Sequence, residues 1–200
     1  MEIDSPAAVH EYGEPNAILD SAGKFSVVLR YPRTGIFAAD EAIYKWASEL
    51  YNSVKEDAAA AGKPNEPSEA DLDVVYNAFM VKENYVGIEE IGYLSGPFLA
   101  HPSDIVKTFN IDIEGKKLLT VGEILNNDAG RILNLLKGKI AERHPDTKDT
   151  LGDVDETWLA YSVIKPSGID VLLPRGEYLP SYLSLQRFTL TWGELGEIGI

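Results

Sequence analysis

Two acidic residues near the middle of the chain, Asp112 and Glu114, have the spacing of a catalytic carboxylate pair. They alternate with apolar residues in "FNIDIEG", so a strand here would place both carboxylates on one face, about 7 Å apart. Pairs of carboxylates at comparable separations act as acid and base in glycosidases. Acidic residues also alternate along the wet face of ordinary half-buried strands. We therefore interpret the pair as a solvated face, and keep a carbohydrate hydrolase using Asp112 and Glu114 as an alternative function.

The three histidines, His10, His101 and His144, do not form a recognisable catalytic or metal-binding set. A serine hydrolase needs a nucleophile, a histidine base and an orienting acid, and the G-x-S-x-G motif is absent. No H-x-H or H-x-x-x-H pair occurs, and the chain has no cysteine. Glycine-rich phosphate loops are also missing. The sequence predicts no catalytic residue, no metal and no cofactor.

His101 precedes a proline in "LAHPSDIV", which favours an extended backbone. Its ring could hydrogen-bond backbone groups of the loop and fix the entry to the next strand. We predict this structural role for His101, with a functional contact as the alternative.

The segment "RGEYLPSY", residues 175–182, places Tyr178 and Tyr182 on either side of Pro180. Proline stiffens the loop, and tyrosine offers a large amphipathic surface, so the three residues suit an interface anchor. The alternative is that both rings fold back onto the sheet.

The charge balance is acidic: 18 Lys and Arg against 32 Asp and Glu give a net charge of −14. Such a chain repels phosphate backbones, so we predict no nucleic-acid partner. It would attract a basic partner over long range, although the charge could serve solubility alone. No apolar run approaches 18 residues, and Met1 is followed by Glu2 and Asp4 rather than by a secretory signal. The protein is then either cytosolic or preceded by an upstream segment.

Periodicity predicts the secondary structure around these residues. Apolar residues recur every three or four positions from 38 to 62 and indicate a long helix, with Trp46 and Tyr51 on its core-facing stripe. Thr120 and Glu123 form a capping box that begins a short helix. A second longer helix begins near Asn127 or Asp128. Strands are predicted at 24–32, 72–82, 85–96, 105–114, 157–165, 168–174 and 184–192.

Most of these strands follow one another through hairpins, which favours an α+β fold. We predict a mostly antiparallel sheet of about seven strands, with two longer helices and one short helix packed on it. Residues 1–22 read as a flexible N-terminal arm, because Pro6, Gly13 and Pro15 interrupt any period. Residues 23–200 then form a single domain.

The stretch "LAHPSDIVKTFNIDIEGKKLLTVGEIL" resembles the extracytoplasmic domain of RsiV-type anti-sigma factors, a bacterial domain of unknown function in most of its occurrences. The matching positions are Ala100, His101, Pro102, Asn110, Asp112, Gly115, Lys116, Leu119 and Thr120. The closing segment, with its "P-x-Y" loop, is similar too, and the likeness spans roughly residues 24–195. One departure is Gly96, which is displaced from the two glycines that usually precede "AHP".

The resemblance implies a cell-envelope sensing or binding domain without catalytic residues. In that family the domain lies outside the cytoplasmic membrane behind a single transmembrane helix, and it binds lysozyme directly. It also occurs as a non-catalytic accessory module of peptidoglycan deacetylases, which is an alternative function here. The resemblance implies an upstream anchor, a basic lysozyme-like partner and a partner-binding edge at Tyr178, Pro180 and Tyr182.

Overall fold

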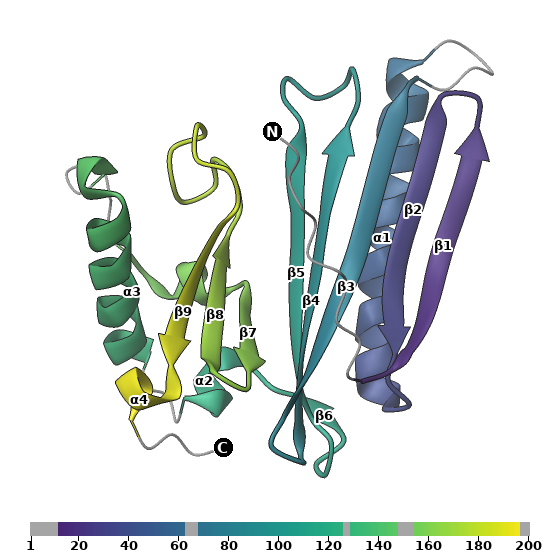
Figure 1. Ribbon diagram of the computed structural model, residues 1–200. Helices are drawn as coiled ribbons and strands as arrows, with labels where there is room; N and C mark the ends of the chain where they lie inside the picture. The colour runs from purple at the N-terminus through teal and green to yellow at the C-terminus, as the bar shows by residue number, and fades with distance from the viewer. Residues whose placement is uncertain (1–11, 63–67, 126–128, 148–153, 197–200) are drawn as a thin grey trace.

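The computed structural model describes residues 12–62, 68–125, 129–147 and 154–196 (Figure 1). They form two β-sheets, each with a long helix packed against it. The predicted α+β class, with two longer helices, is confirmed. The strands are divided between two sheets, however, and do not form the single sheet that the sequence suggested.

The first sheet has six strands in the order β1-β2-β3-β4-β5-β6. Its elements are β1 (Glu14–Ala22), β2 (Phe25–Arg33), α1 (Phe37–Ala61), β3 (Ala70–Val81), β4 (Tyr85–Ser95), β5 (Ser103–Asp112) and β6 (Lys117–Leu118). Neighbouring strands are antiparallel except β2 and β3, which are parallel because α1 carries the chain back between them. The helix buries the apolar stripe predicted from the sequence against one face of this sheet.

The second sheet has three antiparallel strands and carries the C-terminal helices. Its elements are α2 (Val121–Ile124), α3 (Ala129–Arg143), η1 (Pro145–Thr147), η2 (Glu156–Leu159), β7 (Ser162–Lys165), β8 (Gly168–Leu173), β9 (Gln186–Thr191) and α4 (Trp192–Leu195). Ile132, Leu136 and Ile140 of α3 are buried against this sheet. The predicted start of this helix, Asn127 or Asp128, lies outside the described residues.

The N-terminal arm is a correction to the sequence prediction. Residues 14–22 form β1, which pairs along its whole length with β2. The prediction of a flexible arm is therefore wrong for that segment. The strand is mostly exposed, so its sequence lacks the alternation of apolar and polar residues that predicts a strand. Residues 1–11 of the predicted arm lie outside the described part of the chain.

The strand predicted at 157–165 is also shorter than expected, because β7 begins only at Ser162. Asp155 accepts a hydrogen bond from the backbone N–H of Thr157 at 2.9 Å, which starts the 3₁₀ turn η2 in place of a strand.

Both short helices, α2 and α4, begin with the same capping box. Thr120 and Glu123 form the predicted one, and Thr191 and Glu194 form another in "TWGE". Hydrogen bonds from Thr120 and from Lys117 lower the pKa of the Glu123 carboxyl to about 2. A hydrogen bond from Lys139, together with those from Thr191, lowers the pKa of the Glu194 carboxyl to about 2. The second capping box has the same T-x-G-E pattern as the first, so the helix that begins after Thr191 could also have been predicted from the sequence.

The two sheets meet where β7 lies against β3, β4 and β5. Asn110 of β5 donates to the carbonyl of Ser162 at 2.9 Å and accepts from the N–H of Ile164 at 2.8 Å. Its neighbour across the sheet, Gly87, has no space for a side chain, since a Cβ there would lie 1.9 Å from the carbonyl oxygen of Ile164. The two hydrogen bonds of the Asn110 side chain and the close contact at Gly87 therefore hold β7 against the six-stranded sheet.

Candidate functional site

The β4–β5 and β8–β9 loops lie at the same end of the molecule (Figure 1). Between them is a hollow of about 520 Å³, which we call the loop hollow. Its lining residues are Leu99, Ala100, His101, Pro102, Ser103, Arg175, Ser181 and Tyr182. The motifs "AHP" and "RGEYLPSY" thus line one space although about 75 residues separate them.

Asp104 connects the two loops. Its carboxylate accepts a hydrogen bond from the backbone N–H of Arg175 at 3.0 Å and lies 4.0 Å from the guanidinium Nε. Because this bond is made to the backbone of Arg175, Asp104 holds the β8–β9 loop in place whatever the conformation of the Arg175 side chain.

Tyr178 does not point outward: its side chain folds back against η2, which is the alternative to an interface anchor that the sequence left open. Its ring lies 5.1 Å from that of Trp158, and its hydroxyl donates to the carbonyl of Thr157 at 2.8 Å. Burial, together with the neighbouring Glu177, raises the pKa of Tyr178 to about 12, so the hydroxyl stays protonated and keeps donating. Tyr178 is thus an internal support of the loop.

Tyr182 points outward, with 70% of its surface exposed. Its hydroxyl donates to Asp146 at 2.9 Å, which orients the ring without burying it. Pro180 is half-buried and begins the turn that leads to Leu183, whose N–H bonds to the Pro180 carbonyl at 2.9 Å. Of the three proposed anchor residues, Tyr182 is the exposed one.

The prediction for His101 needs correction. Ala100 and His101 are exposed and Pro102 is half-buried, so the "AHP" motif lines the surface of the loop. Within the described residues the His101 ring makes no hydrogen bond, in contrast to the predicted bond to the loop backbone. The extended loop is instead anchored by its neighbours Phe98 and Leu99, which pack against the core.

Asp112 and Glu114 do not form the carboxylate pair of one strand. β5 ends at Asp112, and Glu114 lies in the following turn. The Asp112 carboxylate accepts from the N–H of Gly115 at 2.8 Å and closes that turn. The shared strand face that motivated the hydrolase alternative is therefore absent.

The remaining histidines and acids give no metal centre among the residues that the structure describes. His144 bonds through Nε2 to Gln186 at 3.0 Å and packs edge-on against Phe188. His10 lies outside the described part of the chain. No helix within the described ranges is long and apolar enough to cross a membrane.

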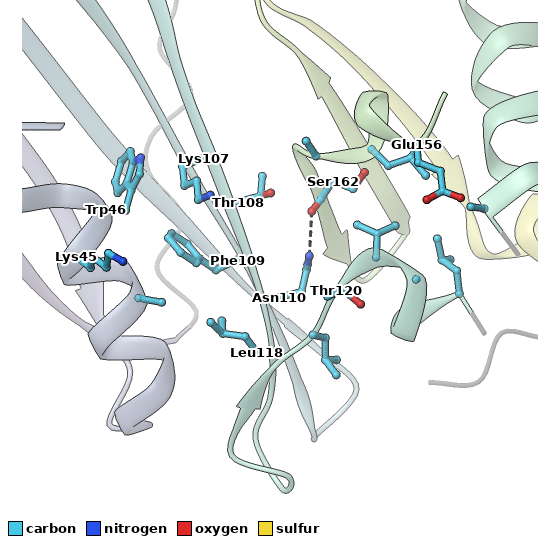
Figure 2. A pocket seen from close by; sticks show the side chains of 18 of the residues that line it. Lys45, Trp46, Lys107, Thr108, Phe109, Asn110, Leu118, Thr120, Glu156 and Ser162 are labelled. Carbon is cyan, nitrogen blue, oxygen red and sulfur yellow. Dashed lines mark hydrogen bonds between the residues drawn. The ribbon is translucent and has the colours of Figure 1, made fainter. Parts of the chain in front are cut away.

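A second hollow, of about 610 Å³, lies beside β5 (Figure 2), and we call it the α1 groove. Lys45 and Trp46 of α1 form one side, and Glu156 and Ser162 lie on the other. Trp46 packs edge-on against Phe109, with ring centroids 6.3 Å apart. The sequence predicted that Trp46 lies in the core, but it is half-buried at the wall of the groove. The apolar stripe of a helix shows which side faces the sheet but not where the sheet ends, so this position could not be predicted.

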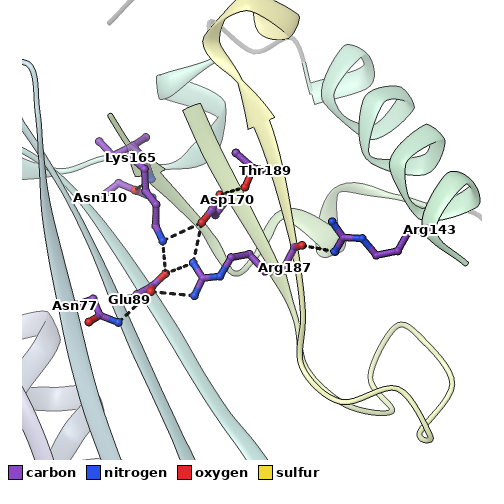
Figure 3. Close-up of polar contacts among 9 residues, drawn as sticks. Asn77, Glu89, Asn110, Arg143, Lys165, Asp170, Arg187 and Thr189 are labelled. Atoms are coloured by element: carbon purple, nitrogen blue, oxygen red, sulfur yellow. Dashed lines mark hydrogen bonds and ion pairs between the residues drawn. The ribbon is translucent and has the colours of Figure 1, made fainter. Parts of the chain in front are cut away.

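A cluster of four charged side chains lies between the sheets (Figure 3). Glu89 of β4 meets Lys165 of β7 and Arg187 of β9, and both cations also contact Asp170 of β8 at 2.9 and 2.7 Å. Two acids and two bases balance in charge. Burial opposes the ionisation of Asp170, but hydrogen bonds from Lys165, Thr189 and Arg187 outweigh it and lower its pKa.

Glu90, next to Glu89, points to the opposite face, where it is fully buried beside Tyr76. Among the described residues neither carboxyl oxygen of Glu90 has a hydrogen-bond partner. Burial raises the pKa of Glu90 well above its ordinary value, because the surrounding apolar side chains disfavour the charged form.

No protein-family model matches this chain, and no curated protein matches it significantly. Solved structures do share its fold. A DUF3298-family protein from Bacteroides fragilis has a TM-score of 0.59 at 12% identity, covering 94% of each chain. A DUF3298-family protein from Pseudomonas aeruginosa PAO1 has a TM-score of 0.60 at 12% identity, covering 92% of this chain and 93% of the other. The chain thus has the fold of a domain family of unknown function.

Proposed function

We propose that this chain is an extracytoplasmic binding or sensing domain of a bacterial cell-envelope protein, and that its partner is a basic protein of the lysozyme type. The observation that carries the proposal is the exposed ring of Tyr182 on the β8–β9 loop. Hydrogen bonds of Tyr178 and of the Arg175 backbone hold this loop in place. The resemblance to RsiV-type domains and the shared DUF3298 fold support it.

The loop has the properties of a preformed anchor site. Tyr178, Asp104 and Asp146 each hold one point of it, so little conformational entropy is lost when a partner docks. Tyr182 supplies a large amphipathic surface of the kind that dominates interface energetics. The net charge of −14 would speed the encounter with a cationic protein.

Calorimetry with hen-type lysozyme at low and at physiological salt tests the proposal. We expect binding that weakens with salt, and we expect Tyr182→Ala to weaken it by about thirtyfold or more. Tyr44→Ala is the matched control, because Tyr44 is another exposed tyrosine but lies on α1. Correctly folded protein that gives no heat at either salt would rule out the lysozyme-type partner. Binding that Tyr182→Ala leaves unchanged would rule out the placement of the site.

We further propose that the domain acts by binding alone. Peptidoglycan or chitin oligomers incubated with the purified chain should release no product. Release that is abolished by Asp112→Asn would overturn this proposal and restore the hydrolase alternative.

A further inference from the structure

The loop hollow differs in charge from the rest of the chain. Acidic residues outnumber basic ones by 32 to 18 overall, yet none of the side chains that line the hollow is a carboxylate. Its ionisable groups are the Arg175 guanidinium, the His101 imidazole and the Tyr182 phenol. The Asp104 carboxylate lies 4.0 Å from the Arg175 Nε, and Asp146 accepts a bond from the Tyr182 hydroxyl, so an anion in this space depends on direct hydrogen bonds from Arg175 rather than on the field of the lining.

Arg175 has the free donors for such an anion. The Asp104 carboxylate bonds to its backbone N–H and approaches only Nε, at 4.0 Å. Its two terminal nitrogens make no hydrogen bond to any residue that the structure describes, and 35% of the side chain is exposed. A guanidinium with its outer nitrogens open binds a carboxylate through two parallel hydrogen bonds.

Neutral donors and an aromatic face surround this cation. Ser103 and Ser181 line the hollow, and neither hydroxyl bonds to another residue that the structure describes. Tyr182 also lines the hollow, and its exposed ring is oriented by the bond to Asp146. Hydroxyl donors, an aromatic face and a volume of about 520 Å³ suit a ring-shaped polar ligand the size of a monosaccharide.

We infer that the loop hollow binds a pyranose sugar that carries a carboxylate. Arg175 holds the carboxylate, the two serines meet the ring hydroxyls, and Tyr182 lies against the ring face. This site goes beyond the protein partner proposed above, because it assigns a small-molecule ligand to the same end of the molecule. It does not depend on that partner.

Three probes separate the chemistries when titrated against the whole chain by amide NMR. Glucuronate carries both ring and carboxylate, glucose carries the ring alone, and N-acetylalanine presents a peptide-like carboxylate alone. We expect glucuronate to shift the amides of residues 99–103 and 175–182 saturably, with an affinity at least about tenfold above that of either other probe. Equal binding of glucose and glucuronate would overturn the carboxylate assignment. Equal or tighter binding of N-acetylalanine would overturn the sugar assignment, and an absence of shifts in these loops would overturn the site.

Two variants place the ligand. Arg175→Gln should reduce glucuronate affinity by about tenfold or more and leave glucose unaffected, because the backbone bond to Asp104 remains. Arg30→Gln is the control, since Arg30 is also a partly exposed arginine with an aspartate partner but lies on β2. The amide spectrum of each variant reports whether it is folded. Glucuronate binding that survives Arg175→Gln in folded protein would contradict the assignment. These shifts and the heat of lysozyme binding are separate readouts, so either can fail alone.

Discussion

Arg187 of β9 donates two parallel hydrogen bonds to Glu89 of β4, at 2.6 and 3.0 Å, across the boundary between the two sheets. The two residues are 98 positions apart in sequence. Only 2% of the Glu89 side chain is exposed, so this pair is a buried connection between the halves of the molecule.

Glu89→Gln should destabilise the protein by about 3–5 kcal/mol, because Arg187 and Lys165 would then share a single anionic partner in a buried place. Urea unfolding measures this free energy. Glu49→Gln is the matched control: Glu49 lies 3.9 Å from Lys45 on the exposed face of α1, and losing that ion pair should change stability by about 0.5 kcal/mol or less. Equal effects of the two substitutions would show that the cluster contributes no more than a surface ion pair.

Glu90 should make the protein less stable as pH rises. Its pKa is raised in the folded state, so above about pH 4.5 the unfolded chain releases a proton that the folded chain keeps. The free energy of unfolding then falls by about 1.4 kcal/mol per pH unit until the folded pKa is reached. Glu90→Gln, which cannot ionise, should remove this slope, so its stability relative to wild type should increase as the pH rises above about 4.5. Parallel stability curves for the two proteins over that range would contradict the assignment.

Gly87→Ala should separate the sheets locally and destabilise the protein by about 2 kcal/mol or more, because the new Cβ would lie 1.9 Å from the Ile164 carbonyl oxygen. Gly138→Ala is the control in the opposite direction. Gly138 lies within α3 with open space around it, so alanine should stabilise the protein there by about 0.5–1 kcal/mol. Thermal unfolding of both variants measures the contrast, and a neutral Gly87→Ala would refute the close contact.

His101→Ala should leave the unfolding free energy within about 0.5 kcal/mol of wild type, since the ring is exposed and makes no bond to any described residue. The hydrogen bond to the loop backbone that the sequence suggested would instead make His101→Ala destabilising. A loss of about 1–2 kcal/mol in chemical unfolding would favour that earlier interpretation.

The sequence predicted those elements whose burial is one-sided. The stripe of α1 and the alternation of β3 and β5 each follow from one apolar face. It did not reveal β1, because a mostly exposed edge strand carries no such alternation. The division into two sheets was also hidden, since strand pairing depends on contacts between residues far apart in the chain.

The consecutive glutamates of β4 show why the charge cluster was missed. Acids in a strand suggest a wet face, but this strand is covered on one side by α1 and on the other by the three-stranded sheet. The nearly unbroken apolar run around them, "YVGIEEIGY", is typical of a strand buried on both faces. Which cations pair with Glu89 depends on β7 and β9, and no local pattern encodes it.

The candidate surface was predicted in parts. The sequence shows both motifs of the loop hollow, but their proximity follows from the fold, in which Asp104 bonds to the backbone of Arg175. The two tyrosines of "RGEYLPSY" have the same type and similar surroundings in sequence, and only the fold distinguishes the internal Tyr178 from the exposed Tyr182.

Hydrogen exchange with and without hen-type lysozyme tests the central claim, that the partner binds where these two loops meet. The account predicts that lysozyme slows amide exchange in residues 97–104 and 175–183 and leaves β1 and α1 unchanged. Protection confined to β1 and α1, or exchange that lysozyme does not alter anywhere, would contradict it.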